Sequence, residues 1–137
     1  MAGNLSVSAD IATSGMRVQA ERLKVIAQNM ANADSISTTP GGEPYRRQVV
    51  SFQNYVDKGT GAEMVRVDKI VQDMSQFDKK YDPHHPGADA QGYVSLPNVN
   101  PLIEMMDMKE AQRAYEANMN MMKTARDMNS SVLDILK

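Results

Sequence analysis

A seven-residue repeat near the C-terminal end constrains the fold of this chain more than any other feature. Between residues 100 and 136, apolar, small or amide residues recur at alternating spacings of three and four. Sustained over about four heptads, this spacing is typical of a helix that packs lengthwise against another helix. The residues of this seam are Met108, Ala111, Tyr115, Asn118, Met122, Ala125, Asn129, Val132 and Leu136. The pattern predicts one long C-terminal helix that needs a helical partner.

The beginning of this helix is marked by two residues. Asn100 is a good N-cap, and Pro101 suits the first helical position because its missing N–H would have no partner there. Asn118 and Asn129 interrupt the apolar seam. They either fix the register of the packed helices or face water because the seam drifts around the helix.

A second helical pattern covers residues 8–32, with Ser8 as the expected N-cap and Asp10 in the first turn. Asn29 and Asn32 are suitable residues for its exit. One apolar stripe contains Ala12, Met16, Ala20, Leu23, Ile26, Ala27 and Met30. An adjacent stripe contains Ile11, Gly15, Val18 and Val25. Because one partner helix covers only one stripe, we expect the second stripe to stay exposed in a lone chain.

This excess of apolar surface suggests that folding of the terminal helices is coupled to assembly. Ordering each residue costs about 1–2 kcal/mol of backbone entropy, and the chain has few large aromatic residues to offset that cost. We therefore expect the ends to be poorly ordered until neighbouring subunits cover them.

The middle of the chain, residues 33–99, reads as loops and short strands. Residues 45–55 and 64–71 favour strands, and Gly59-Thr-Gly61 between them favours a hairpin with a loose turn. Residues 81–92 are rich in turn formers, and a short extended piece follows at 93–96.

The predicted fold class is therefore mainly α with a small β insert. Long N- and C-terminal helices form a coiled-coil pair, and short β hairpins or strands lie between them in the sequence. We expect residues 1–32 and 100–137 to form an axial coiled-coil domain together. Residues 33–99 would form a loop and a small β-rich insert.

Composition and charge exclude several classes of protein. The chain has 15 basic and 17 acidic residues, which argues against a nucleic-acid partner. It has no Cys, so disulfides and thiolate metal sites are ruled out. No apolar run is long enough for insertion into a membrane, and we expect no cleaved signal peptide. The 12 Met residues fit either adaptable contact surfaces or a simple preference for helix formers.

No catalytic motif is present, so we expect a protein that is not an enzyme, with no small-molecule substrate. There is no phosphate-binding loop, dinucleotide turn or nucleophile elbow. His84 and His85 stand between Asp82 and Asp89, but Pro83 and Pro86 make a stiffened turn the better interpretation than a metal site. We expect neither a cofactor nor a metal.

Two stretches resemble the flagellar basal-body rod proteins, most closely the proximal rod members. The first stretch is Leu23-Lys-Val-Ile-Ala-Gln-Asn-Met-Ala-Asn-Ala-Asp34, continuing to Pro44-Tyr-Arg-Arg-Gln48. The second contains Tyr81-Asp-Pro-His-His-Pro-Gly-Ala-Asp89, Gly92-Tyr-Val-Ser-Leu-Pro-Asn-Val-Asn-Pro101, Glu104-Met-Met-Asp-Met108 and Arg113-Ala-Tyr-Glu-Ala-Asn118. The resemblance covers nearly the whole chain in order.

The resemblance implies a structural subunit of the basal body. Such proteins leave the cytoplasm through the flagellar type III export apparatus without a cleaved signal. They assemble with copies and sister subunits into a helical tube that crosses the periplasm and transmits torque from rotor to hook. It also implies partners in the rotor ring and the export gate, and terminal helices that line the tube.

Combining the periodicity with this resemblance gives a candidate assembly interface on the terminal helices. Its residues are Met16, Leu23, Ile26, Met30, Asn32, Met108, Tyr115, Asn118, Met122, Val132 and Leu136. The alternative is a soluble helical binding module or an export adaptor, which would form a discrete dimer or heterodimer with fully helical ends.

Overall fold

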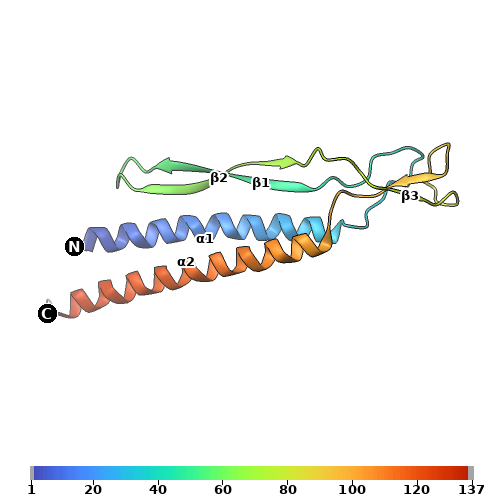
Figure 1. Cartoon of the computed structure of the whole chain (residues 1–137). Coiled ribbons are helices and arrows are strands. Elements are labelled where there is room, and N and C mark those ends of the chain that lie inside the picture. Colours follow the sequence, from blue (N-terminus) through green and yellow to red (C-terminus); the bar gives the residue numbers. More distant parts are fainter. Residues whose placement is uncertain (1, 136–137) are drawn as a thin grey trace. The chain divides into compact units, whose positions relative to one another are not determined.

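The computed structural model describes the backbone of residues 2–135 and the side chains of residues 5–135 (Figure 1). Along the chain, four strands lie between two long helices, in the order α1, β1, β2, β3, β4, α2. Their bounds are α1 Ala2–Ala31, β1 Gln48–Val56, β2 Glu63–Gln72, β3 Lys79–Tyr81, β4 Tyr93–Ser95 and α2 Pro101–Ile135. The strands form two separate antiparallel pairs, β1 with β2 and β3 with β4. This confirms the predicted fold class.

The start of α2 follows the predicted capping pattern. The Asn100 side-chain oxygen accepts a hydrogen bond from the backbone N–H of Leu102 at 3.0 Å. The Asn100 carbonyl accepts the first intrahelical bond, from Glu104 N–H, also at 3.0 Å. Pro101 is the first helical residue, where no N–H is needed.

Helix α1 begins at Ala2, so the prediction of Ser8 as its N-cap is wrong. Ser8 lies inside the helix, and Leu5 and Val7 before it are half-buried. Packing of those apolar residues favours an earlier start than local capping preference suggests, because adding a turn to an existing helix needs no new nucleus. At the other end, the Asn32 amide donates to the Gln28 carbonyl at 2.8 Å and satisfies a terminal acceptor, as expected of an exit residue.

The chain divides into two compact units. The first unit contains Met1–Leu23, Val50–Lys69 and Lys109–Lys137. Within it, α1 lies between the β1–β2 hairpin and α2 (Figure 1). Contacts pair Arg22 with Glu110 and Thr13 with Met122, so α1 and α2 run antiparallel here.

The hairpin of the first unit is closed by the predicted loose turn. The Asp57 carboxylate accepts hydrogen bonds from the backbone of Gly59 and Thr60 and from the Thr60 hydroxyl. Gly61 has φ of +69°, a left-handed conformation that favours glycine. The N–H of Val65 on β2 donates to the hydroxyl of Ser14 on α1 at 3.4 Å, which places the hairpin against that side of the helix.

The second apolar stripe of α1 is mostly covered, so the expectation that it stays exposed is wrong. Val18, one turn beyond Ser14, is only 3% exposed, and Val25 is 2% exposed. Ile11 remains 41% exposed. Helical periodicity does not show that the chain's own β1–β2 hairpin packs on α1. For that reason the sequence suggested that neighbouring subunits cover this stripe.

The second unit contains Lys24–Val49 and Ile70–Met108. Its strands β3 and β4 pair with Lys79 opposite Ser95 and Tyr81 opposite Tyr93. The two tyrosine rings meet edge to face with centroids 5.3 Å apart. Strand β4 matches the predicted extended segment, whereas β3 was not predicted as a strand because three charged or polar residues carry no apolar alternation.

No helix within residues 2–135 is both long and apolar enough to cross a membrane.

Candidate functional site

The seam between α1 and α2 in the first unit is built from small residues. Ala111 is fully buried, and Ala12 and Ala125 are nearly so. Gly15 leaves space for Asn118: a β-carbon at Gly15 would lie 2.7 Å from the Asn118 amide nitrogen. Asn118 is therefore packed into the seam, which favours the register-fixing interpretation over exposure to water.

The structure places most of the predicted interface residues toward the interior of the chain. Ile26 is buried. The others described here are half-buried: Met16, Leu23, Met30, Asn32, Met108, Tyr115, Asn118, Met122 and Val132. Leu136 lies outside the described residues. These side chains thus hold the chain's own elements together, and only their exposed parts are available to neighbours.

Beside its seam, α2 carries large apolar side chains that stay exposed within the described residues. Met121 is 66% exposed, Met128 53% and Ile135 83%. The exposed apolar residues on this helix are Leu102, Ile103, Met105, Met106, Met121, Met128, Leu133 and Ile135. Met121, Met128 and Ile135 are seven residues apart and form one row along the helix, and an exposed apolar row of this kind is typical of a protein–protein contact surface.

A buried polar cluster occupies the second unit. Glu104 is completely buried and Asn29 is 1% exposed. The Asn29 amide nitrogen donates to Glu104 Oε2 at 3.2 Å and to the Gln48 carbonyl at 2.9 Å. Its oxygen accepts from the Gln48 N–H and the Tyr45 hydroxyl, both at 2.9 Å. Every hydrogen-bonding position of this amide is filled, as burial requires.

Arg47 supplies the charge that compensates Glu104. Arg47 Nε lies 2.6 Å from Glu104 Oε1, and Nη2 lies 3.3 Å from Asp107 Oδ2. Asp73 approaches Nη1 at 3.7 Å. Burial alone would lower the pKa of Arg47, but the hydrogen bond to Glu104 and the three nearby carboxylates together raise it. The guanidinium therefore stays charged, which a buried carboxylate needs.

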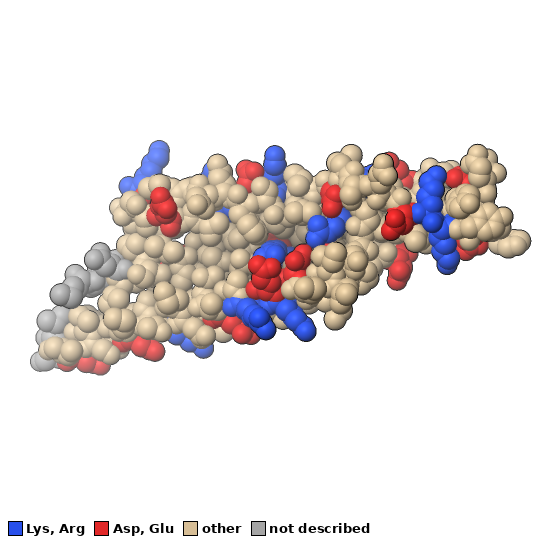
Figure 2. Space-filling view, in the orientation of Figure 1, with Lys and Arg blue, Asp and Glu red and all other residues tan. Residues whose placement is uncertain are grey.

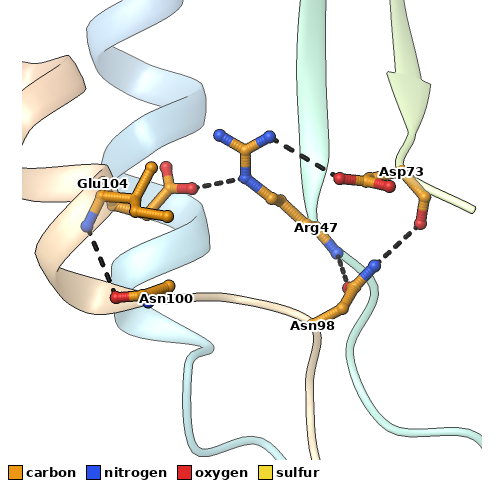
Figure 3. A pocket seen from close by; sticks show the side chains of 6 residues that line it. Arg47, Asp73, Asn98, Asn100 and Glu104 are labelled. Atoms are coloured by element: carbon orange, nitrogen blue, oxygen red, sulfur yellow. Dashed lines mark hydrogen bonds and ion pairs between the residues drawn. The ribbon is translucent and has the colours of Figure 1, made fainter. Parts of the chain in front are cut away.

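Arg47, Asp73 and Glu104 line a small open hollow together with Asn98, Asn100 and Ile103 (Figure 3). Asn98 joins two segments there: its oxygen accepts from the Arg47 N–H at 2.8 Å, and its nitrogen donates to the Asp73 carbonyl at 2.9 Å. Burial, with a smaller contribution from Glu104, raises the pKa of the Tyr45 hydroxyl, so it remains a hydrogen-bond donor. The filled hydrogen bonds make this cluster a structural clamp.

The role of this cluster is not apparent from the sequence, where Asn29 was expected only to end the helix. Asn29 instead lies inside α1 and is buried. One signal was available. Glu104 precedes Met108 by four residues and so continues the seam of α2, where a charge needs a buried partner.

The chain was compared with known proteins. Residues 90–135 match the family model described as flagellar basal body rod FlgEFG protein C-terminal. The flagellar basal-body rod protein FlgC of Agrobacterium fabrum is 47% identical over 133 residues, which cover 97% of this chain and 96% of the relative. FlgC of Borreliella burgdorferi is 42% identical, covering 95% and 96%, and FlgC of Bacillus subtilis is 37% identical, covering 95% and 97%.

The chain belongs to the FlgC family of flagellar basal-body rod proteins. The similarity to FlgC extends over both units and both long helices. In this FlgC-family chain, the covered seam, the exposed face of α2 and the buried cluster are therefore parts of one rod-protein fold.

The His84–His85 loop shows no metal-binding geometry among the described residues, where no three His, Asp or Glu side chains converge. His85 Nδ1 instead accepts a hydrogen bond from the Gly87 N–H at 3.0 Å. Asp89 accepts from the backbone N–H groups of Tyr93 and Gln91, and these bonds, with nearby Lys79, lower its pKa. The loop is a turn held by its own polar groups.

The face shown in Figure 2 is mostly uncharged, with acidic and basic side chains scattered singly or in small groups. No broad area of one sign is visible on that face. Such a surface suits contacts between protein subunits better than attraction of a polyanion.

Proposed function

We propose that copies of this chain assemble with one another and with sister rod proteins into the helical tube of the proximal rod, and that this tube transmits torque from rotor to hook. Membership of the FlgC family shows that the chain is a structural subunit of the flagellar basal-body rod and is located in the basal body. The proposal adds how the subunit assembles and what the assembly does.

The exposed apolar face of α2 carries this proposal. Met121, Met128 and Ile135 are exposed in the single chain. When a neighbour covers them, the free energy falls by about 25 cal/mol for each Å² of apolar surface buried. Met is well suited to a surface that must adapt to several slightly different neighbours. A heterologous contact of this kind repeats into a helical assembly when the rotation does not close.

The predicted interface residues also contribute to the proposed assembly. Met16, Leu23 and Met122 are half-buried in the chain, so each keeps an exposed part that a neighbouring subunit could cover. We propose that the terminal helices form the axial coiled-coil part of the rod, with residues 33–99 as the insert. Torque transmission requires this part to resist shear, and the Glu104–Arg47–Asn29 clamp supports it by fixing α1, α2 and the segment that leads into β1.

We also propose that the chain has no enzymatic activity and that the rotor ring and the export gate are among its partners. The filled hydrogen bonds of the buried cluster leave no free nucleophile or general base there. The partners come from the position that a proximal rod subunit occupies, next to the rotor.

Electron microscopy of isolated basal bodies tests the proposal. The map should contain this chain in the proximal rod, with the exposed face of α2 against another subunit. Cells without the chain should be non-motile and regain swimming when it is supplied. Basal bodies complete without the chain, or rods in which the α2 face contacts only solvent, would refute the proposal.

A further inference from the structure

The β1–β2 hairpin of the first unit has one backbone edge that points away from the rest of that unit. Near the turn, β2 lies next to α1, where Val65 donates its hydrogen bond to Ser14, and β1 lies on the far side of β2 from the helix (Figure 1). In an antiparallel pair, alternate residues turn their N–H and C=O groups outward. The outward groups of β1 near the turn therefore need a partner from outside the hairpin.

Hydrogen bonds at the two ends of β1 show which residues these are. At the turn, the Asp57 N–H donates to the Ala62 carbonyl at 2.9 Å, so odd-numbered positions face β2. At the other end, the N–H and C=O of Gln48 both bond to the Asn29 side chain, so even-numbered positions face outward. The outward residues near the turn are Phe52, Asn54 and Val56.

This edge is open and unprotected near the turn. Within the described residues, no hydrogen bond reaches the outward backbone groups of residues 52, 54 and 56. Phe52 is 41% exposed and Val56 58%. Sheet edges are normally protected by charged residues or Pro, but β1 contains neither. Only another extended strand can pair with N–H and C=O groups that alternate in this way, so the expected partner is a strand.

The edge matches a second copy of itself when the two strands run antiparallel. With Asn54 opposite Asn54 of the second copy, Phe52 stands opposite Val56 and Val56 opposite Phe52. Outward-facing positions then meet outward-facing positions, and each opposed pair exchanges both of its backbone hydrogen bonds. An aromatic residue opposite a β-branched one is a favourable cross-strand pair, and two Asn amides can each donate and accept.

The same pattern selects this register over its neighbours. A shift of two residues in either direction keeps the backbone bonds but sets Asn54 against an apolar side chain of the other copy. It also leaves fewer of the outward residues opposed. Because β1 has no charged residue, the pairing of two identical strands meets no repulsion between like charges.

We propose that two free copies of this chain pair through the outer edges of β1 at residues 52–56, antiparallel about a two-fold axis at Asn54. The inference goes beyond the proposed function, since a two-fold contact uses the same surface twice and ends at a dimer. A tube that leads from rotor to hook has two different ends, so this contact does not repeat along it. The dimer therefore belongs to subunits that have not yet entered the rod, and it covers an edge that would otherwise recruit other strands.

Thiol cross-linking tests the register, because the natural chain contains no Cys. Purified Phe52→Cys and Val56→Cys chains are mixed and treated with a cross-linker too short to span about 13 Å. Each variant alone is the matched control, since two identical positions lie that distance apart along the strands, four residues at about 3.3 Å each. We expect at least about tenfold more cross-linked dimer from the mixture. Equal yields would overturn the proposed register.

A proline at the centre of the edge tests the backbone contact. Asn54→Pro removes the outward N–H, a position where an edge strand tolerates Pro. Asn54→Ala keeps the N–H and is the control. Sedimentation at a series of concentrations should show dimerisation weakened at least about tenfold by Asn54→Pro and by less than about threefold by Asn54→Ala. Equal dimerisation of Asn54→Pro and the natural chain would overturn the proposal.

Asn54→Lys provides a test that does not depend on proline. Two lysines would stand directly opposite each other in the dimer, so association should again weaken at least about tenfold. The side chain is exposed in the single chain, and the urea midpoint of the dilute protein should stay unchanged. A natural chain that stays monomeric at every concentration, or a dimer that persists in Asn54→Lys, would overturn the proposal.

Rod assembly separates this inference from the proposed function. Cells that produce Asn54→Lys should build rods that contain the chain, because the two-fold contact is absent from the tube. Loss of this variant from basal bodies, with its folding intact, would overturn the assignment of the dimer to free subunits. Absence of the natural chain from basal bodies would refute the proposed function and leave the dimer measurements standing.

Discussion

Helices α1 and α2 differ in how many of their faces the rest of the chain covers. In the first unit, α1 has the hairpin on one side and α2 on another, so Val18 and Ala12 are both buried. Helix α2 has α1 on one side, and the row next to this contact exposes Met121 and Met128. Two helices with similar apolar content therefore differ in coverage: α1 belongs mainly to the core, and α2 keeps a row of apolar side chains exposed.

The comparison also separates two ways of joining the helices. In the first unit, alanines and Gly15 allow close apolar packing around Asn118. In the second unit, the buried Glu104 is held by Asn29 and Arg47. Apolar packing tolerates small shifts, whereas a buried charge fixes its partners because any movement leaves it unpaired.

The largest expected effect on stability is from Val18→Asp. A charge placed on the covered side of α1 should lower the free energy of unfolding by about 4 kcal/mol, because the carboxylate has no partner there. Urea unfolding of the purified chain measures it. Ala20→Asp, two residues further on at an exposed position, is the matched control and should change stability by less than about 0.5 kcal/mol. Equal effects would show that the hairpin does not cover α1.

The next effect is that of Glu104→Ala, which should cost about 3 kcal/mol because Arg47 and Asn29 lose their buried partner. Glu104→Gln keeps the shape and one acceptor, and should cost about half as much. Thermal unfolding compares the two variants. If both were as stable as the natural chain, the polar cluster would contribute nothing to holding α1 and α2 in register.

Two adjacent methionines of α2 sharpen the comparison further. Met122→Asp places a charge in the half-buried seam. It should lower the free energy of unfolding by about 2 kcal/mol and also prevent incorporation into the rod. Met121→Asp faces outward and should leave stability within about 0.5 kcal/mol while still abolishing incorporation. Unfolding curves and basal-body composition are measured for both. Normal swimming of cells with Met121→Asp would show that the exposed face of α2 has no part in assembly.

The smallest effect concerns pH and the loop of the second unit. Hydrogen bonds from Tyr93 and Gln91 hold the pKa of Asp89 below the 3.8 expected for an unfolded chain. Its stabilisation is therefore complete above about pH 4 and is lost as pH falls through the lower folded value. Asp89→Asn should reduce the drop in urea midpoint between pH 6 and pH 3. Asp68→Asn, an exposed carboxylate on β2, is the control, and equal curves for Asp89→Asn and the natural chain would contradict the assignment.

The sequence by itself determined the elements that depend on local patterns. Heptad spacing gave α2 its length and its inward seam, Asn100 and Pro101 gave its start, and Gly59 to Gly61 marked the hairpin turn. These signals act over a few residues, so they can be recognised without a fold. The same reasoning placed the start of α1 at Ser8, too late, since capping preference is weaker than the packing of Leu5 and Val7.

Only the tertiary structure decided which apolar stripe is covered and where the buried charges meet. Asn29, Arg47 and Glu104 are far apart in the sequence, and nothing local shows that one amide would bind both a strand backbone and a carboxylate. Likewise, the return of the hairpin onto α1 buries Val18 and leaves the surplus apolar surface on α2. Periodicity gives the direction of a side chain from its own helix, but burial depends on which distant segment packs there.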